Sequence, residues 1–206
     1  MRPIVFVAVA CHFYGENIIC ETTRVRLGAV LDAIRKCLAI VPNRRVRVVV
    51  TGDVSYHPDG IKLNQLMERY LLDEMRRRKI SGNISVVLSG GVGVFSEARW
   101  LAAWMVRENI THSVVSICGS DWYLEAAKPV WRHMLNRFCA GVNFRLDFVS
   151  VEGTGGERTR SFYRKYAFLI KTAHKMRFIG AFMVLETLMY LLQNGRKRGF
   201  TWNGCA

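Results

Sequence analysis

Five short runs of β-branched and other apolar residues predict strands. They lie at residues 4–10, 46–51, 84–88, 113–117 and 144–149. Between them, four segments with apolar residues at a helical period predict helices, at residues 21–40, 59–80, 96–108 and 123–138. Strand followed by helix, repeated in this way, is typical of a parallel sheet that is covered on both faces. The pattern therefore predicts a doubly wound α/β fold with five mainly parallel strands.

The pattern changes after the last predicted strand. Residues 152–157, EGTGGE, predict a flexible loop, and a long basic and apolar stretch follows. Residues 158–200 hold ten Lys or Arg and a single acid, Glu186. Residues 178–192 are very apolar, but they are too few, and too interrupted by Glu186, to span a bilayer. We expect one domain over residues 1–206, with a sheet core at 1–151 and a basic helical extension at 152–206 that packs against the sheet.

Composition narrows the class of protein. The chain has 206 residues, of which 50% are hydrophobic and 22% charged, which excludes disordered, collagen-like and disulfide-scaffold classes. Six cysteines are scattered without a CxxC pair or a zinc-ligand spacing, so no metal is expected and the thiols are predicted to be reduced in a cytoplasmic protein. A formal net charge of +14 predicts anionic partners, either phosphate groups, nucleic acid or anionic lipid.

Small and polar residues follow four of the predicted strands. Right-handed crossovers place these loops at one edge of the sheet, where open α/β sheets bind their ligands. Glycine there lets backbone N–H groups approach a phosphate, although tight turning alone also favours glycine. The candidate ligand-binding residues are Gly52, Asp53, Ser89, Gly90, Gly91, Glu97, Gly119, Ser120, Asp121 and Trp122.

Two carboxylates in these loops are candidate catalytic groups. Asp53 and Asp121 each follow a strand, where they are placed to hold a ribose hydroxyl or to act as acid and base. Each also has a purely structural interpretation: Asp53 as a turn residue and Asp121 as a helix cap. Glu97 has one too, because the helix dipole favours an acid in the first turn of a helix. Trp122 is placed to stack on a planar ligand. The absence of GxGxxG and of GxxxxGK[ST] disfavours a nicotinamide enzyme and a P-loop NTPase.

Five stretches between residues 4 and 149 form a recognisable series: TTRVRLGAVLDAI, VRVVVTGD, LNQLMERYLLDEM, VFSEARWLAAWMV and VVSICGSDWYLEAA. Together they resemble the SanA and YdcF-like family of bacterial proteins. The resemblance implies a Rossmann-like three-layer sandwich, a nucleotide-like ligand and, in the cytosolic branch of the family, S-adenosylmethionine. Glu97 and Ala98 keep the family pattern, whereas Trp122 stands at the family histidine and Glu125 at the family arginine. An indole cannot act as a general base, so the family's site does not transfer as it stands.

These observations predict a cytosolic protein that binds a nucleotide-like small molecule at the carboxyl edge of the sheet, with S-adenosylmethionine as one candidate. If the protein is an enzyme, we expect a transferase or hydrolase that acts on a nucleotide-like or phosphate-bearing substrate. Two alternatives stay open: a non-catalytic interaction protein, and a protein that binds a polyanion, nucleic acid or an anionic membrane, through residues 158–198.

Overall fold

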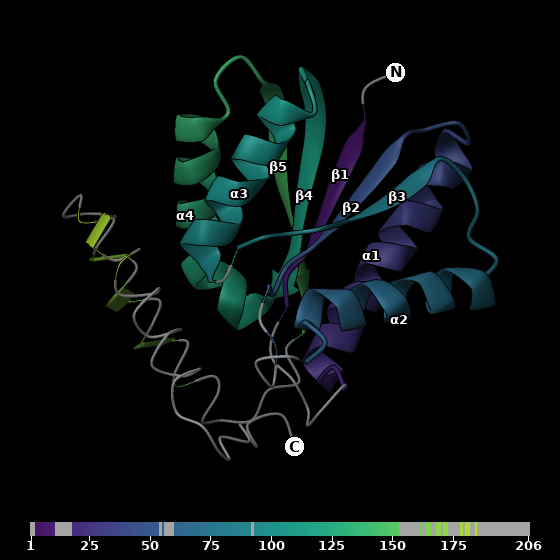
Figure 1. Cartoon of the computed structure of the whole chain (residues 1–206), viewed down its shortest axis with the longest axis horizontal. Helices are drawn as coiled ribbons and strands as arrows, with labels where there is room; N and C mark the ends of the chain where they lie inside the picture. Colours follow the sequence, from purple (N-terminus) through teal and green to yellow (C-terminus); the bar gives the residue numbers. More distant parts are fainter. Residues whose placement is uncertain are drawn as a thin grey trace.

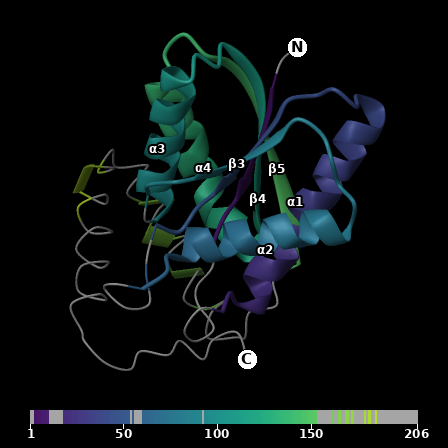
Figure 2. The same ribbon diagram turned by 45° about the vertical axis from the view of Figure 1, so that its right-hand side comes forward.

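The computed structural model describes residues 3–10, 18–53, 55, 60–91 and 93–152, together with residues 161, 164, 165, 168, 169, 171, 172, 178, 180, 181 and 184. A twisted parallel sheet lies at its centre, between two layers of helices (Figures 1 and 2). This is the Rossmann-like sandwich that was predicted.

All five predicted strands are present. They are β1 (Ile4–Ala8), β2 (Val46–Val50), β3 (Ile84–Leu88), β4 (His112–Ser120) and β5 (Asn143–Val151). Their order in the sheet is β3-β2-β1-β4-β5, and every neighbouring pair is parallel. The chain therefore returns from the β3 edge to the far side of β1, which makes the β1/β4 boundary the topological switch point of the sheet.

The four helices divide between the two faces of the sheet. The helices α1 (Glu21–Ile40) and α2 (Leu63–Arg77) share a core with the side chains on one face of the strands. The helices α3 (Val94–Arg107) and α4 (Asp121–Phe138) share a second core on the opposite face, where Trp131 and Phe95 are fully buried. Each face of the sheet is covered by two amphipathic helices, and the apolar residues of these helices recur at the helical period that the sequence predicted.

Three of the four helix starts differ from the predicted ones. The segment 119–122 is no loop, because Gly119 and Ser120 still pair with β5 and α4 begins at the next residue, Asp121. The helix α2 begins at Leu63, four residues later than expected, and α3 begins at Val94, two residues earlier. Inside the first turn of α3, the Ser96 hydroxyl donates back to the Gly93 carbonyl.

The described residues of the C-terminal segment are helical apart from Phe178. None of them joins either core: Phe168 is 69% exposed, and Phe178 and Val184 are also exposed. One ion pair connects them to the sheet domain, from Lys171 Nζ to the Glu125 carboxylate on α4 at 3.0 Å. These residues lie beyond α4 in Figure 1, and most of the predicted extension at 152–206, with its predicted packing against the sheet, lies outside the described residues. Within the described chain, no helix is long and apolar enough to cross a membrane.

Arg78 connects α2 to α1 through charge. Its guanidinium donates to Asp32 on α1 and to Glu74 on α2, each at 3.0 Å. Glu74 also accepts two hydrogen bonds from Arg77, at 2.8 and 2.7 Å. These arginine hydrogen bonds, led by the one from Arg77, lower the pKa of Glu74 from its ordinary value of 4.5 to about 2. The carboxylate therefore stays ionised in the folded protein at pH values where a free glutamate is protonated.

The hydrogen bonds from Arg77 and Arg78 to Glu74 predict a specific loss of stability in acid. A carboxyl whose pKa is lower in the folded state stabilises that state above the unfolded pKa, and the contribution disappears as the pH falls from about 4.5 towards 2. We expect Glu74→Gln to lower the free energy of unfolding at pH 7 and to approach the wild type near pH 2. Urea denaturation at several pH values measures this difference. Glu68→Gln on the same helix is the matched control. If the difference in unfolding free energy between the wild type and Glu74→Gln did not change with pH, the lowered pKa of Glu74 would be contradicted.

Candidate functional site

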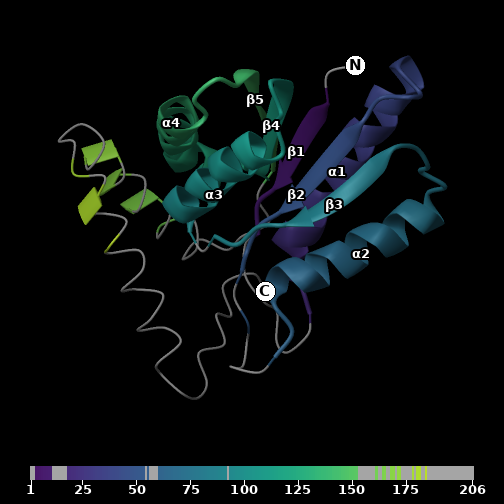
Figure 3. The same ribbon diagram turned by 45° about the horizontal axis from the view of Figure 1, so that its top comes forward.

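The predicted site residues do gather at one edge of the sheet. Gly52 and Asp53 follow β2, Ser89 to Gly91 follow β3, and Ser120 ends β4. Because all five strands are parallel, their carboxyl ends and the N-terminal ends of the four helices lie at this same edge, as Figure 3 shows. The edge includes the β1/β4 switch point, where open α/β sheets bind ligands.

The loops after β2 and β3 are bound to each other by Asn64. Its backbone N–H donates to the Gly52 carbonyl at 3.1 Å, and its side-chain Nδ2 donates to the Ser89 carbonyl at 2.9 Å. A hydrogen bond from the Asp53 backbone N–H to the Gly91 carbonyl, at 3.3 Å, joins the same two loops directly. Asn64 is 2% exposed, and its Oδ1 has no hydrogen-bond partner in the part of the chain that the structure describes. Sequence reasoning missed this residue, although it lies in phase with the buried Met67 and Leu71 of α2.

Close packing accounts for the glycines at this edge. A Cβ on Gly91 would lie 2.5 Å from the backbone nitrogen of Glu97, and one on Gly90 would lie 2.8 Å from Trp100 Nε1. A Cβ on Gly119 would likewise lie too close to the ring of Tyr123, and one on Gly52, whose φ is +92°, would lie too close to Ala10. Protein atoms alone therefore require glycine at these four positions, and a ligand is not needed to explain them.

Arg26 of α1 is the central residue of the switch point. Its Nε and Nη2 donate to the Ser120 hydroxyl oxygen at 3.1 and 3.0 Å, and its Nη1 donates to the carbonyls of Val9 and Ala10, each at 2.9 Å. The rings of Trp122 and Tyr123 lie 5.4 and 5.3 Å from its Cζ. One side chain thus joins the ends of β1 and β4 to the first turn of α4.

The charge of Arg26 is buried without an acidic partner. The side chain is fully inaccessible to water, and its acceptors are a hydroxyl and two carbonyls, all neutral. Among the described residues, no carboxylate lies within ion-pair distance of it. A guanidinium remains protonated even when buried, so a positive charge persists beneath the switch point. The sequence does carry a signal for it: Arg26 lies in phase with the buried Thr22, Val30 and Leu31 of α1.

The two candidate catalytic carboxylates have different surroundings. Asp53 is three-quarters buried and forms an ion pair with Lys62 Nζ at 2.6 Å. Asp121 is exposed, as the first residue of α4. The strand β1 lies between the strands that carry them, which places the two strand ends roughly 10 Å apart. They are therefore separate groups at one edge rather than a paired dyad.

The remaining predicted residues lie mostly inside the protein. Trp122 is 9% exposed and belongs to the core under α4, with Arg26 over its ring. Glu97 is 6% exposed in the first turn of α3, against Gly91. Glu125, at the family arginine position, is exposed and bound to Lys171. Of the predicted set, Asp53 and Asp121 are the acidic residues that reach the surface.

A thiol lies close to the switch point but is not reactive. Cys118 Sγ donates to the Arg26 carbonyl at 3.4 Å, and burial raises the pKa of this thiol to about 11 although the Arg26 charge opposes the shift. It is therefore protonated at neutral pH and cannot serve as a nucleophile. Among the described residues, Cys20, Cys37, Cys118 and Cys139 form no disulfide bond. Within the described ranges, no three His, Cys, Asp or Glu side chains are grouped to hold a metal ion.

No family model, no curated protein and no solved structure matches this chain. The resemblance to the SanA and YdcF-like family therefore stays a prediction.

Arg26 is predicted to be essential for the stability of this edge. Arg26→Gln removes the charged fork and leaves the Val9 and Ala10 carbonyls without their donors, which should lower the free energy of unfolding by about 2–4 kcal/mol. Arg26→Lys keeps the charge but not the fork, so we expect a smaller loss. Urea denaturation measures both. Arg35→Gln, on the exposed face of the same helix, should change stability by less than about 0.5 kcal/mol; an equal loss there would refute the role given to Arg26.

Proposed function

We propose that this protein binds a small nucleotide-like molecule through its phosphate at the carboxyl edge of the sheet, over the β1/β4 switch point. The observation that carries the proposal is the buried guanidinium of Arg26, which has no acidic partner among the described residues. An uncompensated positive charge in a low-dielectric site attracts an anion more strongly than an exposed one does. A phosphate above Ser120 would supply the missing negative charge.

The start of α4 supports the same proposal. Ser120 is the N-cap residue of α4, yet its side chain makes no capping bond, because its hydroxyl oxygen accepts from Arg26. The first turn of α4 begins directly after Ser120, so the positive end of the helix dipole lies at the same place. Asp121, exposed beside them, is the carboxylate that we assign to a ribose hydroxyl.

Charge decides between the ligand candidates. S-adenosylmethionine carries a sulfonium cation, which the Arg26 charge repels, whereas a nucleotide phosphate is attracted. We therefore expect phosphate-bearing nucleotides and sugar nucleotides to bind more tightly than S-adenosylmethionine. If the bound molecule is turned over, as by a transferase or hydrolase, Asp121 is the better candidate acid or base, because Asp53 is already paired with Lys62.

Calorimetric titration with adenine nucleotides, sugar nucleotides and S-adenosylmethionine tests the proposal. We expect a phosphate-bearing ligand to give the largest heat and thermal shift, and Asp121→Asn to weaken it about tenfold by removing a charged acceptor. Glu108→Gln, at the opposite edge of the sheet, is the matched control and should bind as the wild type does. If folded protein gave no heat and no thermal shift with any of these ligands, the proposal would be wrong, and the residues at this edge would serve packing alone.

The C-terminal segment supports a second candidate function, the binding of a polyanion. Arg164 and Lys165 are exposed, and Phe168, one turn further along, is 69% exposed. A basic and aromatic surface of this kind attracts phosphates at low salt and can stack on bases. Such a protein needs no catalytic activity.

Fluorescence anisotropy with single-stranded RNA and duplex DNA, and co-sedimentation with anionic vesicles, test this second candidate over a salt series. Specific recognition predicts that one polyanion is preferred at physiological salt, and that Arg164→Gln with Lys165→Gln reduces its affinity about tenfold. Arg107→Gln with Arg99→Gln, both exposed on α3, is the control of equal charge. Affinity that disappears for every polyanion at physiological salt would rule out the candidate.

A further inference from the structure

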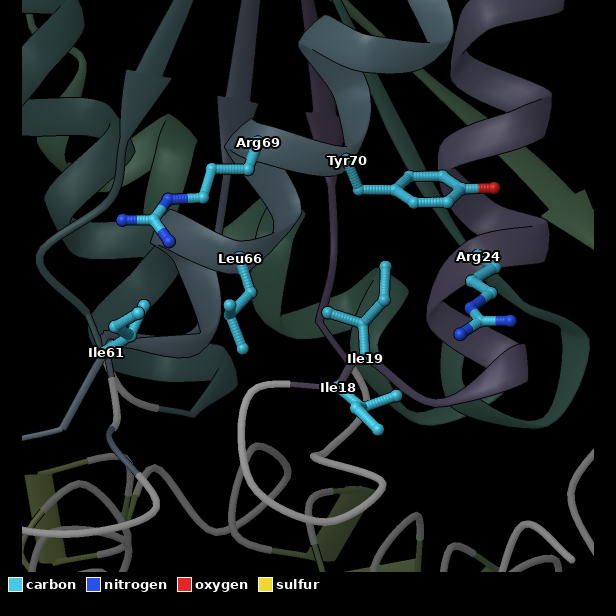
Figure 4. A pocket seen from close by; sticks show the side chains of 7 residues that line it. All are labelled: Ile18, Ile19, Arg24, Ile61, Leu66, Arg69 and Tyr70. Atoms are coloured by element: carbon cyan, nitrogen blue, oxygen red, sulfur yellow. The ribbon is translucent and has the colours of Figure 1, made fainter.

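A pocket separate from the switch point opens between α1 and α2. It has a volume of about 460 Å³ and lies where both helices begin, at the carboxyl edge of β1 and β2 (Figure 4). Four aliphatic side chains line it: Ile18 and Ile19 before α1, Ile61 before α2, and Leu66 in α2. This volume falls within the range of roughly 300–1,000 Å³ that small-molecule pockets typically have.

Three polar side chains surround this aliphatic lining. Arg24 of α1 and Arg69 of α2 lie on opposite sides of it in Figure 4, and Tyr70 lies between them with its hydroxyl directed towards α1. Burial raises the pKa of Tyr70, so its hydroxyl remains a hydrogen-bond donor at neutral pH. The described lining holds no carboxylate and no amide side chain. The pocket therefore offers donors and cations around a hydrocarbon surface.

The two arginines are available to a ligand. Among the described residues, no acid forms an ion pair with Arg69. Arg24 has one acidic partner, Glu21, at 3.7 Å, and both side chains are about half exposed. An exposed pair at that distance contributes little, so an anion can displace it at small cost. The N-terminal ends of α1 and α2 add positive potential from their dipoles.

We propose that this pocket binds a free single-chain amphiphile: a hydrocarbon chain with one phosphate or carboxylate head group. The chain lies on Ile18, Ile19, Ile61 and Leu66, and the head group meets Arg69 or Arg24. The positive charges of Arg24 and Arg69 favour an anionic head group. A nucleobase with amino groups fits less well, because it needs hydrogen-bond acceptors and the described lining supplies no carboxylate or amide. This site is distinct from the proposed nucleotide site, because its described lining includes neither Arg26 nor Asp121.

Isothermal titration calorimetry with hexyl, octyl and decyl phosphate, each below its micelle concentration and at physiological salt, tests the proposal. Affinity should rise roughly fourfold for each methylene that the pocket covers. Arg69→Gln should weaken every alkyl phosphate about tenfold. Ile18→Ser, at a side chain 44% exposed, should reduce the gain with chain length without unfolding the protein. Alkyl carboxylates of the same lengths identify which head group is preferred.

Matched controls lie on α3, on the other face of the sheet. Arg107→Gln and Val106→Ser replace an exposed arginine and a 43% exposed valine, and both should bind as the wild type does. Affinity that does not depend on chain length, or an equal loss in Arg107→Gln, would overturn the proposal in favour of nonspecific charge attraction. Binding to phosphatidylglycerol vesicles without any binding of the monomeric alkyl phosphates would overturn it in favour of a bilayer surface.

Discussion

The guanidinium of Arg26 cannot be left in the protein interior without hydrogen-bond acceptors, and two separate segments supply them while a third covers the cation. Val9 and Ala10 bring carbonyls from the end of β1, Ser120 brings its hydroxyl from the end of β4, and the rings of Trp122 and Tyr123 cover the cation from α4. Because Arg26 belongs to a helix on the other face of the sheet, it couples the two cores at the switch point. The two helical layers are thus fixed relative to each other by a buried charge as well as by the strands.

The architecture could be predicted from the sequence because periodicity reports burial directly. The buried set of α1 recurs at the helical period, and the β-branched runs match the strands to within a few residues. The errors fall at junctions. Gly119 and Ser120 have the composition of a loop, yet parallel pairing with Ser150 and Val151 keeps them in β4. Ladder partners that lie far away in the sequence are invisible to a local pattern.

The candidate site was harder to predict for a different reason. Glycines and acids at strand ends are conspicuous in a sequence, whereas Arg26 and Asn64 lie within helices that are identified by their apolar residues. Both are polar residues in phase with a buried face, and polar residues are buried only when their hydrogen bonds are satisfied from elsewhere in the fold. That condition depends on tertiary contacts, so periodicity can flag such residues but cannot name their partners.

The direct passage from β4 into α4 has a mechanical consequence. Ser120 is the last residue of the strand and Asp121 the first of the helix, so no connecting residue can absorb a rotation between them. By contrast, β1, β2 and β3 are each followed by a connecting segment before the next helix begins. The β4–α4 part of the edge therefore presents a rigid boundary to an incoming molecule, because its strand and its helix cannot reorient separately.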